Sequence, residues 1–132
     1  MEDVFKISKD KERAKDMLKL VKDREELLKL IPKDKAFKVI EDYYEIIKEL
    51  LTAIMYLDGY KTLSHVKLIE YFALHYSELN EMEIKLIDNM RKFRIGTMYY
   101  GKDVTTDFLE NTENDIQKIV RILTNLVARK IK

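Results

Sequence analysis

The stretch KAFKVIEDYYEIIKELLTAIMYL, residues 35–57, determines the fold. Apolar side chains recur in it at steps of three and four, the period of a helix, along two adjacent stripes. The stripes are Phe37, Ile40, Tyr44, Ile47, Leu51, Ile54 and Val39, Tyr43, Ile46, Leu50, Ala53, Leu57. Two neighbouring stripes form a wider apolar face than a surface helix carries, so we expect residues 35–57 to form the central, most buried helix.

Local signals place a helix before this segment and a turn after it. Ser8 is a good N-cap and Pro32 cannot continue a helix, so the first helix is expected to run from Ser8 to Ile31. Asp58 and Gly59 are expected to end the central helix in a turn, with Gly59 in the left-handed position that follows a helix.

Three further helices are expected towards the C-terminus. Ser64 caps a short helix from His65 to Tyr76, and Asn80 caps a fourth helix that ends near Gly101. A fifth helix is expected after a loop at residues 103–106 and reaches residue 131. The connections between these helices are short. Helices joined in this way pack most simply as an all-α fold, an up-and-down four-helix bundle with an additional short helix.

The composition supports this fold class and excludes several kinds of protein. The 132 residues fit one domain, 1–132, without repeats or linkers, and three Gly and one Pro are too few for an all-β chain. The absence of Cys excludes disulfides, thiolate zinc sites and cysteine catalysis. No apolar run approaches the roughly 18 residues of a membrane span, and no secretory signal opens the chain, so a cytoplasmic protein is expected.

The width of the apolar face on the central helix also bears on assembly. One bundle is expected to leave part of that face uncovered, and uncovered apolar surface favours association of two copies. A homodimer is therefore predicted.

Residue types that bind metals or transfer protons are present, but their spacing does not indicate a site. His65 and His75 lie ten residues apart, and no pair of acids lies at a metal-ligand spacing from both, so both are expected to be structural residues of the short helix. Glu41 and Glu45 lie four residues apart on the polar edge of the central helix, where they are expected to face solvent. No catalytic residue is assigned, and neither a metal nor a cofactor is predicted.

A basic and aromatic segment, RKFRIGTMYYGK at residues 91–102, carries the candidate binding site. Continuing the helical steps from Ile84 and Ile87 places Arg91 and Arg94 on the apolar face of the fourth helix. A guanidinium there needs a partner, which could be an acid of the bundle, a second subunit or a phosphate. Gly96, which is unfavourable inside a helix, suggests a close backbone approach or a break.

The aromatic side chains of the same segment could stack on a base of single-stranded nucleic acid. The alternative is that helix ends commonly collect cations and that tyrosines pack in cores. The candidate binding residues are Arg91, Arg94, Tyr99, Tyr100 and Lys102.

The order of these parts resembles the HEPN family over nearly the whole chain. The resemblance lies in DYYEII at residues 42–47, DGYK at 58–61, Ser-His at 64–65 and the arginine segment up to Gly101. It implies a helical bundle that dimerises and is often encoded beside a nucleotidyltransferase partner in toxin–antitoxin pairs.

Many HEPN proteins are metal-independent ribonucleases in which an arginine and a following histidine of both subunits meet at the dimer interface. By resemblance, Arg94 corresponds to that arginine, whereas Tyr99 or Tyr100 occupies the place of the histidine. A phenol has a pKa near 10 and is a poor general base at neutral pH. The resemblance therefore implies binding of nucleotide or RNA phosphate at a dimer interface without catalysis.

Two other functions stay open. The net charge is only +1, whereas proteins that bind nucleic acid usually carry a strong basic excess. This favours a protein-interaction module that binds a nucleotidyltransferase, with Arg94 in an interface ion pair. The remaining alternative is an atypical metal-independent ribonuclease in which a tyrosine replaces the histidine.

Overall fold

The chain folds into a bundle of helices with one small sheet. A computed structural model describes residues 4–94 and 101–132. The elements, in chain order, are β1 (Val4–Lys6), α1 (Lys11–Leu28), α2 (Ala36–Asp58), β2 (Tyr60–Thr62), α3 (His65–His75), α4 (Glu81–Arg94) and α5 (Lys102–Ile131). The expected all-α bundle is confirmed.

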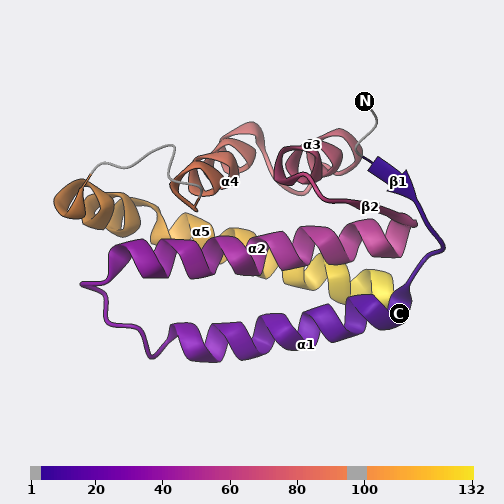
Figure 1. Ribbon diagram of the computed structural model, residues 1–132, viewed down its shortest axis with the longest axis horizontal. Helices are drawn as coiled ribbons and strands as arrows, with labels where there is room; N and C mark the ends of the chain where they lie inside the picture. The colour runs from indigo at the N-terminus through magenta and orange to yellow at the C-terminus, as the bar shows by residue number, and fades with distance from the viewer. Residues whose placement is uncertain (1–3, 95–100) are drawn as a thin grey trace.

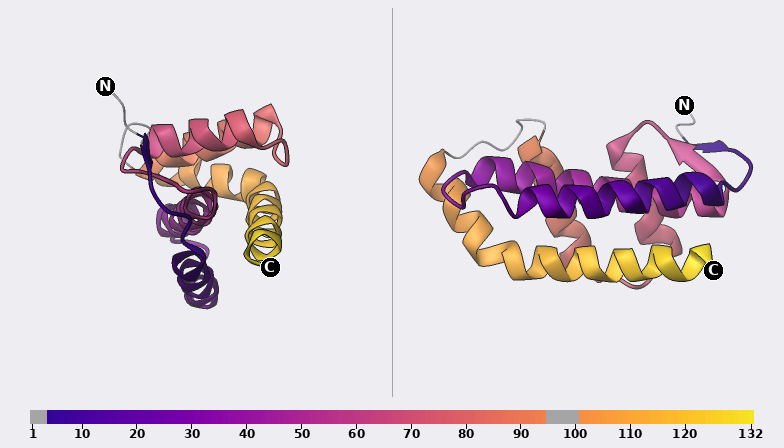
Figure 2. Two further views of the ribbon diagram at one scale, coloured as in Figure 1. Left: turned by 90° about the vertical axis from the view of Figure 1, so that its right-hand side faces the viewer. Right: turned by 90° about the horizontal axis from the view of Figure 1, so that it is seen from below.

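Helix α2 is the centre of this bundle. Helices α1, α2 and α5 run along the long axis of the molecule, whereas α3 and α4 lie across α2 (Figures 1 and 2). Helix α2 contacts each of the other four helices of the described chain. The small sheet and the C-terminal end of α5 lie at the same end of the molecule (Figure 1).

The burial of α2 confirms that its two apolar stripes determine the fold. Every member of both stripes is buried except Phe37, which is 44% exposed near the start of the helix. Helices α1, α4 and α5 cover these stripes within one chain. The argument for a dimer from uncovered surface on this helix is therefore wrong, and the homodimer itself stays a prediction.

Three of the expected caps are confirmed. Gly59 ends α2 in the left-handed conformation, with φ 90° and ψ 35°. The Ser64 hydroxyl accepts a hydrogen bond from the backbone N–H of Lys67 at 3.1 Å. Asn80 and Glu83 cap α4 reciprocally, because each side chain accepts from the backbone N–H of the other, at 2.8 and 2.9 Å.

Helix α1 begins later than the sequence suggests, so the expected N-cap at Ser8 is wrong. The N-cap is Asp10. The backbone before it is bound to the end of α2: the N–H of Ile7 donates to the carbonyl of Gly59 at 2.8 Å, and that of Asp10 donates to the carbonyl of Tyr56 at 3.0 Å. A segment held by these long-range bonds cannot also form the first turn of a helix.

The other end of α1 is shorter than expected as well. The helix ends at Leu28 rather than at Ile31. The next backbone bonds run from Leu30 to the carbonyl of Leu27 and from Ile31 to the carbonyl of Leu28, at 3.0 and 3.1 Å. These bonds span three residues instead of the four of an α-helix, so the chain turns more tightly here, as is common where a helix ends before a proline.

Helix α5 begins where a loop was expected, so the loop at residues 103–106 is wrong. The helix starts at Lys102 after Gly101, and Thr105 is buried in its first turns. The hydroxyls of Thr105 and Thr106 donate to the carbonyls of Gly101 and Lys102, four residues earlier. These bonds satisfy two polar side chains within the helix, so their presence does not break it. The expected end of the fourth helix near Gly101 lies outside the described residues.

The sheet was not expected from the sequence. Strands β1 and β2 pair in antiparallel register, with Val4 opposite Thr62 and Lys6 opposite Tyr60. Each strand has three residues, too short for a recognisable alternation of apolar and polar side chains. Strand β2 follows the turn at Gly59, so its pairing with β1 holds the N-terminal segment next to the C-terminal end of α2.

Candidate functional site

The structure brings together only some of the predicted binding residues. Arg91 and Arg94 lie in the last turn of α4, where this helix crosses the middle of α2. Lys102 lies elsewhere, at the start of α5. Tyr99 and Tyr100 lie outside the described residues.

Lys102 belongs to a groove between the starts of α2 and α5. The groove has a volume of about 480 Å³. Its lining also includes Lys35, which precedes α2, and Phe37 and Lys38 of α2. On α2, Lys38 precedes Glu45, the partner of Arg94, by seven residues, about 10 Å at 1.5 Å per residue. The structure therefore does not place Lys102 beside the two arginines.

Glu45 is the acid that meets Arg94. The Nε of Arg94 donates to Oε1 of Glu45 at 3.0 Å, and Nζ of Lys48 lies 3.0 Å from Oε2. The side chain of Glu45 is only 14% exposed, so the expectation that it faces solvent is wrong. The reason is tertiary, because α4 crosses α2 here and covers the polar edge on which Glu45 lies.

The two cations keep Glu45 ionised. Burial alone would raise the pKa of its carboxyl, but the hydrogen bonds from Lys48 and Arg94 outweigh burial and lower the pKa. Glu45 is therefore a bridging carboxylate between α2 and α4 at neutral pH.

Arg91 leans inward, as its helical position predicts. Its side chain is 15% exposed, and its Nε donates to Oδ1 of Asp88 at 2.8 Å. Lys92 lies 3.5 Å from the other oxygen of the same carboxylate. Arg94 is more open, with its side chain 40% exposed.

A histidine joins this group from α3. The hydroxyl of Tyr44 lies 2.9 Å from Nδ1 of His65, and the two rings are 5.7 Å apart. Burial lowers the pKa of His65, and the positive charges of Lys48 and Arg94 lower it further. His65 is therefore neutral at pH 7.

The partner of His65 keeps its proton. Burial raises the pKa of Tyr44 far above its ordinary value, although the nearby Arg91 opposes the shift. Tyr44 can donate its proton to Nδ1 of His65, in which case the ring carries its own proton on Nε2.

These side chains form one polar cluster over three helices, which we call the arginine cluster. Its members are Tyr44, Glu45, Lys48, His65, Asp88, Arg91, Lys92 and Arg94. Four permanent cations face two carboxylates, so the cluster has an excess of two positive charges. The Nη1 and Nη2 atoms of Arg91 and of Arg94 make no hydrogen bond to any residue that the structure describes.

These terminal guanidinium groups determine what the cluster can bind. Each arginine uses only Nε on its acid partner, and the terminal N–H groups match the oxygens of a phosphate. Within residues 4–94 and 101–132, no group of three or more acids and histidines could hold a metal ion. The chemistry that the cluster offers is therefore anion binding, with a neutral imidazole nearby.

Sequence reasoning found the arginines but not their surroundings. Glu45 precedes Arg94 by 49 residues in the chain. The sequence predicts only a structural role for His65, because the other histidine is ten residues away and no pair of acids lies at a metal-ligand spacing from both. No local sequence pattern predicts that α3 and α4 bring His65 and the two arginines to the same side of α2.

Comparisons with known proteins do not identify this chain. No family model, no curated protein and no solved structure matches it. Among the helices of the described chain, none has both the length and the apolar composition needed to cross a bilayer.

Proposed function

We propose that this chain is a HEPN-like helical domain that binds the phosphate of a nucleotide or of RNA, without catalysis. The observation that supports it best is the pair of guanidinium groups of Arg91 and Arg94. Both are oriented by a carboxylate through Nε, and both keep their terminal Nη groups unbonded within the described chain. A side chain oriented in this way loses less conformational entropy when it binds a ligand.

The charge of the arginine cluster supports an anionic ligand. Its excess of two positive charges contrasts with the net charge of +1 for the whole chain. A local excess attracts phosphate even when the complete protein is almost neutral. One of the cations in this count, Lys48, lies on α2 and the other three lie on α4, so a phosphate could be approached from two helices.

The dimer in this proposal rests on the family resemblance. HEPN domains place the arginine segment at an interface between two subunits, and the all-α bundle with a long central helix is compatible with that arrangement. We propose that two copies of this chain bring their arginine clusters to the same interface, and that a nucleotidyltransferase is the protein partner.

A second candidate function is a protein-interaction module without a nucleotide ligand. The observation that favours it is that both arginines already have acid partners within the chain, Asp88 and Glu45. In this case the Nη groups would bind carboxylates of a partner protein rather than a phosphate.

The first proposal is tested by fluorescence anisotropy with a labelled single-stranded RNA over a range of salt concentrations. Arg94→Gln should weaken binding about tenfold, because hydrogen bonds to charged groups are worth roughly 1.5–3 kcal/mol. It should also reduce the slope of log affinity against log salt by about 0.7, the value for one lost phosphate contact on a single strand.

The matched control is Arg129→Gln, which removes the same charge from an arginine that pairs with Glu78, away from the arginine cluster. This variant should bind RNA like the unmodified chain apart from a small uniform effect of charge. Equal losses in the two variants, or no binding by the unmodified chain at low salt, would contradict phosphate binding by Arg94. Sedimentation of the same samples tests the dimer.

A further inference from the structure

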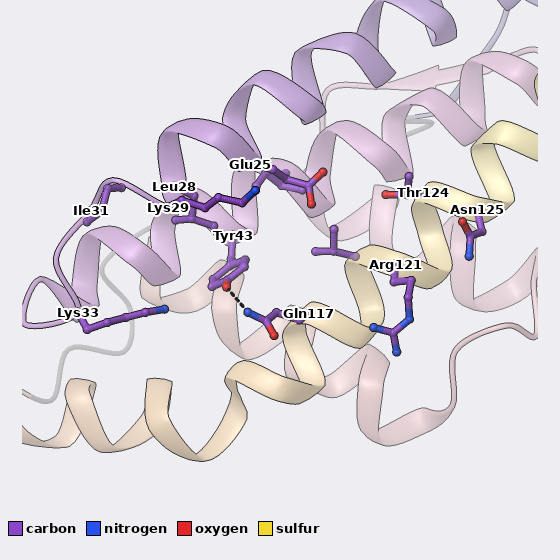
Figure 3. A pocket seen from close by; sticks show the side chains of 12 residues that line it. Glu25, Leu28, Lys29, Ile31, Lys33, Tyr43, Gln117, Arg121, Thr124 and Asn125 are labelled. Carbon is purple, nitrogen blue, oxygen red and sulfur yellow. Dashed lines mark hydrogen bonds between the residues drawn. The ribbon is translucent and has the colours of Figure 1, made fainter.

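A second cavity lies on the other side of α2, between α1 and α5. These two helices flank α2 (Figure 2). Residues of all three helices and of the connection between α1 and α2 line a groove of about 600 Å³ (Figure 3). Tyr43 and Ile46 of α2 form part of its lining. They are the sequence neighbours of Tyr44 and Glu45, which belong to the arginine cluster. The central helix therefore presents two different sites to two sides of the molecule.

The dimensions of the groove suit a small molecule. On α5 its lining extends from Gln117 to Asn125, about 12 Å at 1.5 Å per residue. Pockets that bind small ligands have volumes of roughly 300–1,000 Å³. A partner helix would need a longer contact, so the groove is better matched to a ligand than to a helix.

The surface of the groove is amphiphilic. Leu28, Ile31, Ile46 and Val120 contribute apolar surface, whereas Lys29, Lys33 and Arg121 contribute three cations against the single carboxylate of Glu25. Lys29 and Lys33 are paired with Glu26 and Glu113. Both lysines are well exposed, and exposed ion pairs contribute little, so they do not prevent a ligand from approaching.

Two groups on the α5 side of the groove have no partner within the described chain, a buried hydroxyl and an exposed guanidinium. The hydroxyl Oγ1 of Thr124 is buried but makes no hydrogen bond within the described chain. Buried polar atoms are nearly always hydrogen-bonded, and Thr124 is one of the residues that line the groove (Figure 3). Arg121, one helical turn earlier on the same wall, makes neither a hydrogen bond nor an ion pair with any described residue.

The polar side chains where α2 meets α5 already have hydrogen-bond partners, so this part of the groove can form a fixed surface. The hydroxyl of Tyr43 donates to Glu113 at 2.8 Å and accepts from Nε2 of Gln117 at 3.0 Å, the bond drawn in Figure 3. These bonds connect α2 with α5 across one end of the groove. Among the described residues of the groove, the donors without a partner therefore lie on α5, at Thr124 and Arg121 and their immediate neighbours.

We propose that this groove binds a small amphiphilic carboxylate, such as a medium-chain fatty acid. Its hydrocarbon part lies on Leu28, Ile46 and Val120. Its carboxylate accepts hydrogen bonds from the hydroxyl of Thr124 and from the guanidinium of Arg121. This ligand satisfies the buried hydroxyl, pairs the unpaired cation and covers the apolar surface in one molecule.

The test compares octanoate with 1-octanol, which has the same chain without the charge. Each is titrated into the full chain while the methyl signals of its isoleucines are followed by NMR. Saturable shifts are expected at Ile31 and Ile46 in the groove and not at Ile69 and Ile87, which do not line it. Octanoate should bind about tenfold more tightly than octanol, because a charged hydrogen bond is lost with the alcohol.

Three variants locate the binding on the groove. Arg121→Gln should weaken octanoate binding about tenfold and leave octanol binding unchanged, whereas Arg129→Gln, further along the same helix, should change neither. Thr124→Val keeps the shape of the side chain and should weaken octanoate binding several-fold. Absence of saturation, equal binding of both ligands, or unchanged octanoate binding in Arg121→Gln would overturn the proposal.

Discussion

Replacing Asp58 by alanine should destabilise the fold more than any other single removal of a surface acid. Asp58 is the last residue of α2, and its carboxylate joins three elements. Oδ2 accepts from the hydroxyls of Tyr71 and Tyr76 at 2.8 and 2.6 Å, and Oδ1 lies 2.9 Å from Nζ of Lys130. The carboxylate thus connects the ends of α2, α3 and α5.

The size of the effect follows from these three bonds. A hydrogen bond to a charged group contributes about 1.5–3 kcal/mol, but the tyrosine hydroxyls are only partly buried and regain water in the variant. We therefore expect Asp58→Ala to lower the free energy of unfolding by about 2–4 kcal/mol at pH 7. For a chain of this length that corresponds to a fall in Tm of roughly 6–16 °C.

The effect should depend on pH in a defined direction. Burial would raise the pKa of Asp58, but the hydrogen bonds from Lys130, Tyr76 and Tyr71 outweigh it and lower the pKa below its ordinary value of 3.8. A lowered pKa means that the stabilisation is complete above about pH 4 and is lost as pH falls through the folded-state value. The difference between Asp58→Ala and the unmodified chain should therefore shrink in strong acid.

The assay is thermal and urea unfolding followed by circular dichroism at pH 7 and at pH 3 and below. Asp107→Ala is the matched control, because Asp107 is exposed on α5. Combining Asp58→Ala with Tyr71→Phe completes a double-mutant cycle, and the tyrosine change should cost less once the carboxylate is absent. A stability of Asp58→Ala within about 0.5 kcal/mol of the control, or an unchanged cost of Tyr71→Phe in both backgrounds, would refute this reasoning.

Three further variants test the turn at the end of α2, with Gly101 as its comparison, and the arginine cluster. Gly59→Ala should lower the free energy of unfolding by about 2–3 kcal/mol and Gly101→Ala by about 1–2 kcal/mol, measured by urea unfolding. Both glycines have positive φ, but within the described chain only a Cβ at Gly59 would meet a close atom, the carbonyl oxygen of Ile7 at 3.1 Å. Equal costs would contradict this close approach. Glu45→Gln keeps an oxygen that can accept from Nε of Arg94 but removes one of the two negative charges of the arginine cluster, so it should raise the affinity for single-stranded RNA about three- to tenfold in anisotropy measurements. Unchanged or lower affinity would contradict phosphate binding at this cluster.

The elements that could be predicted are those whose signals are local. The stripes of α2 repeat at the helical period over its whole length, and their burial follows whichever helices surround them. Gly59, Ser64 and Asn80 act on the backbone within a few residues of themselves, so their caps also form as predicted. The inward lean of Arg91 belongs to the same class, since it follows from helical spacing alone.

The elements that could not be predicted depend on residues far apart in the chain. Ser8 is as good a cap as Asp10 locally, but the backbone around it is bound to the end of α2. Residues 103–106 carry loop-like polar side chains, whereas Thr105 packs into the core and bonds within the helix. Glu45 lies on a polar edge of α2 that only the crossing of α4 covers.

The amino-acid sequence by itself determined that the chain is all-α, which helix is central, where several helices begin and end, and that Arg91 and Arg94 lie near each other on α4, with Arg91 leaning inward. These properties arise from side chains within a few residues of each other. Only the tertiary structure decided that Glu45, Lys48 and His65 surround those arginines, that Lys102 lies apart from them, and that a groove opens between α1 and α5. These properties depend on how helices cross, and a crossing is set by packing between surfaces that are distant in the chain.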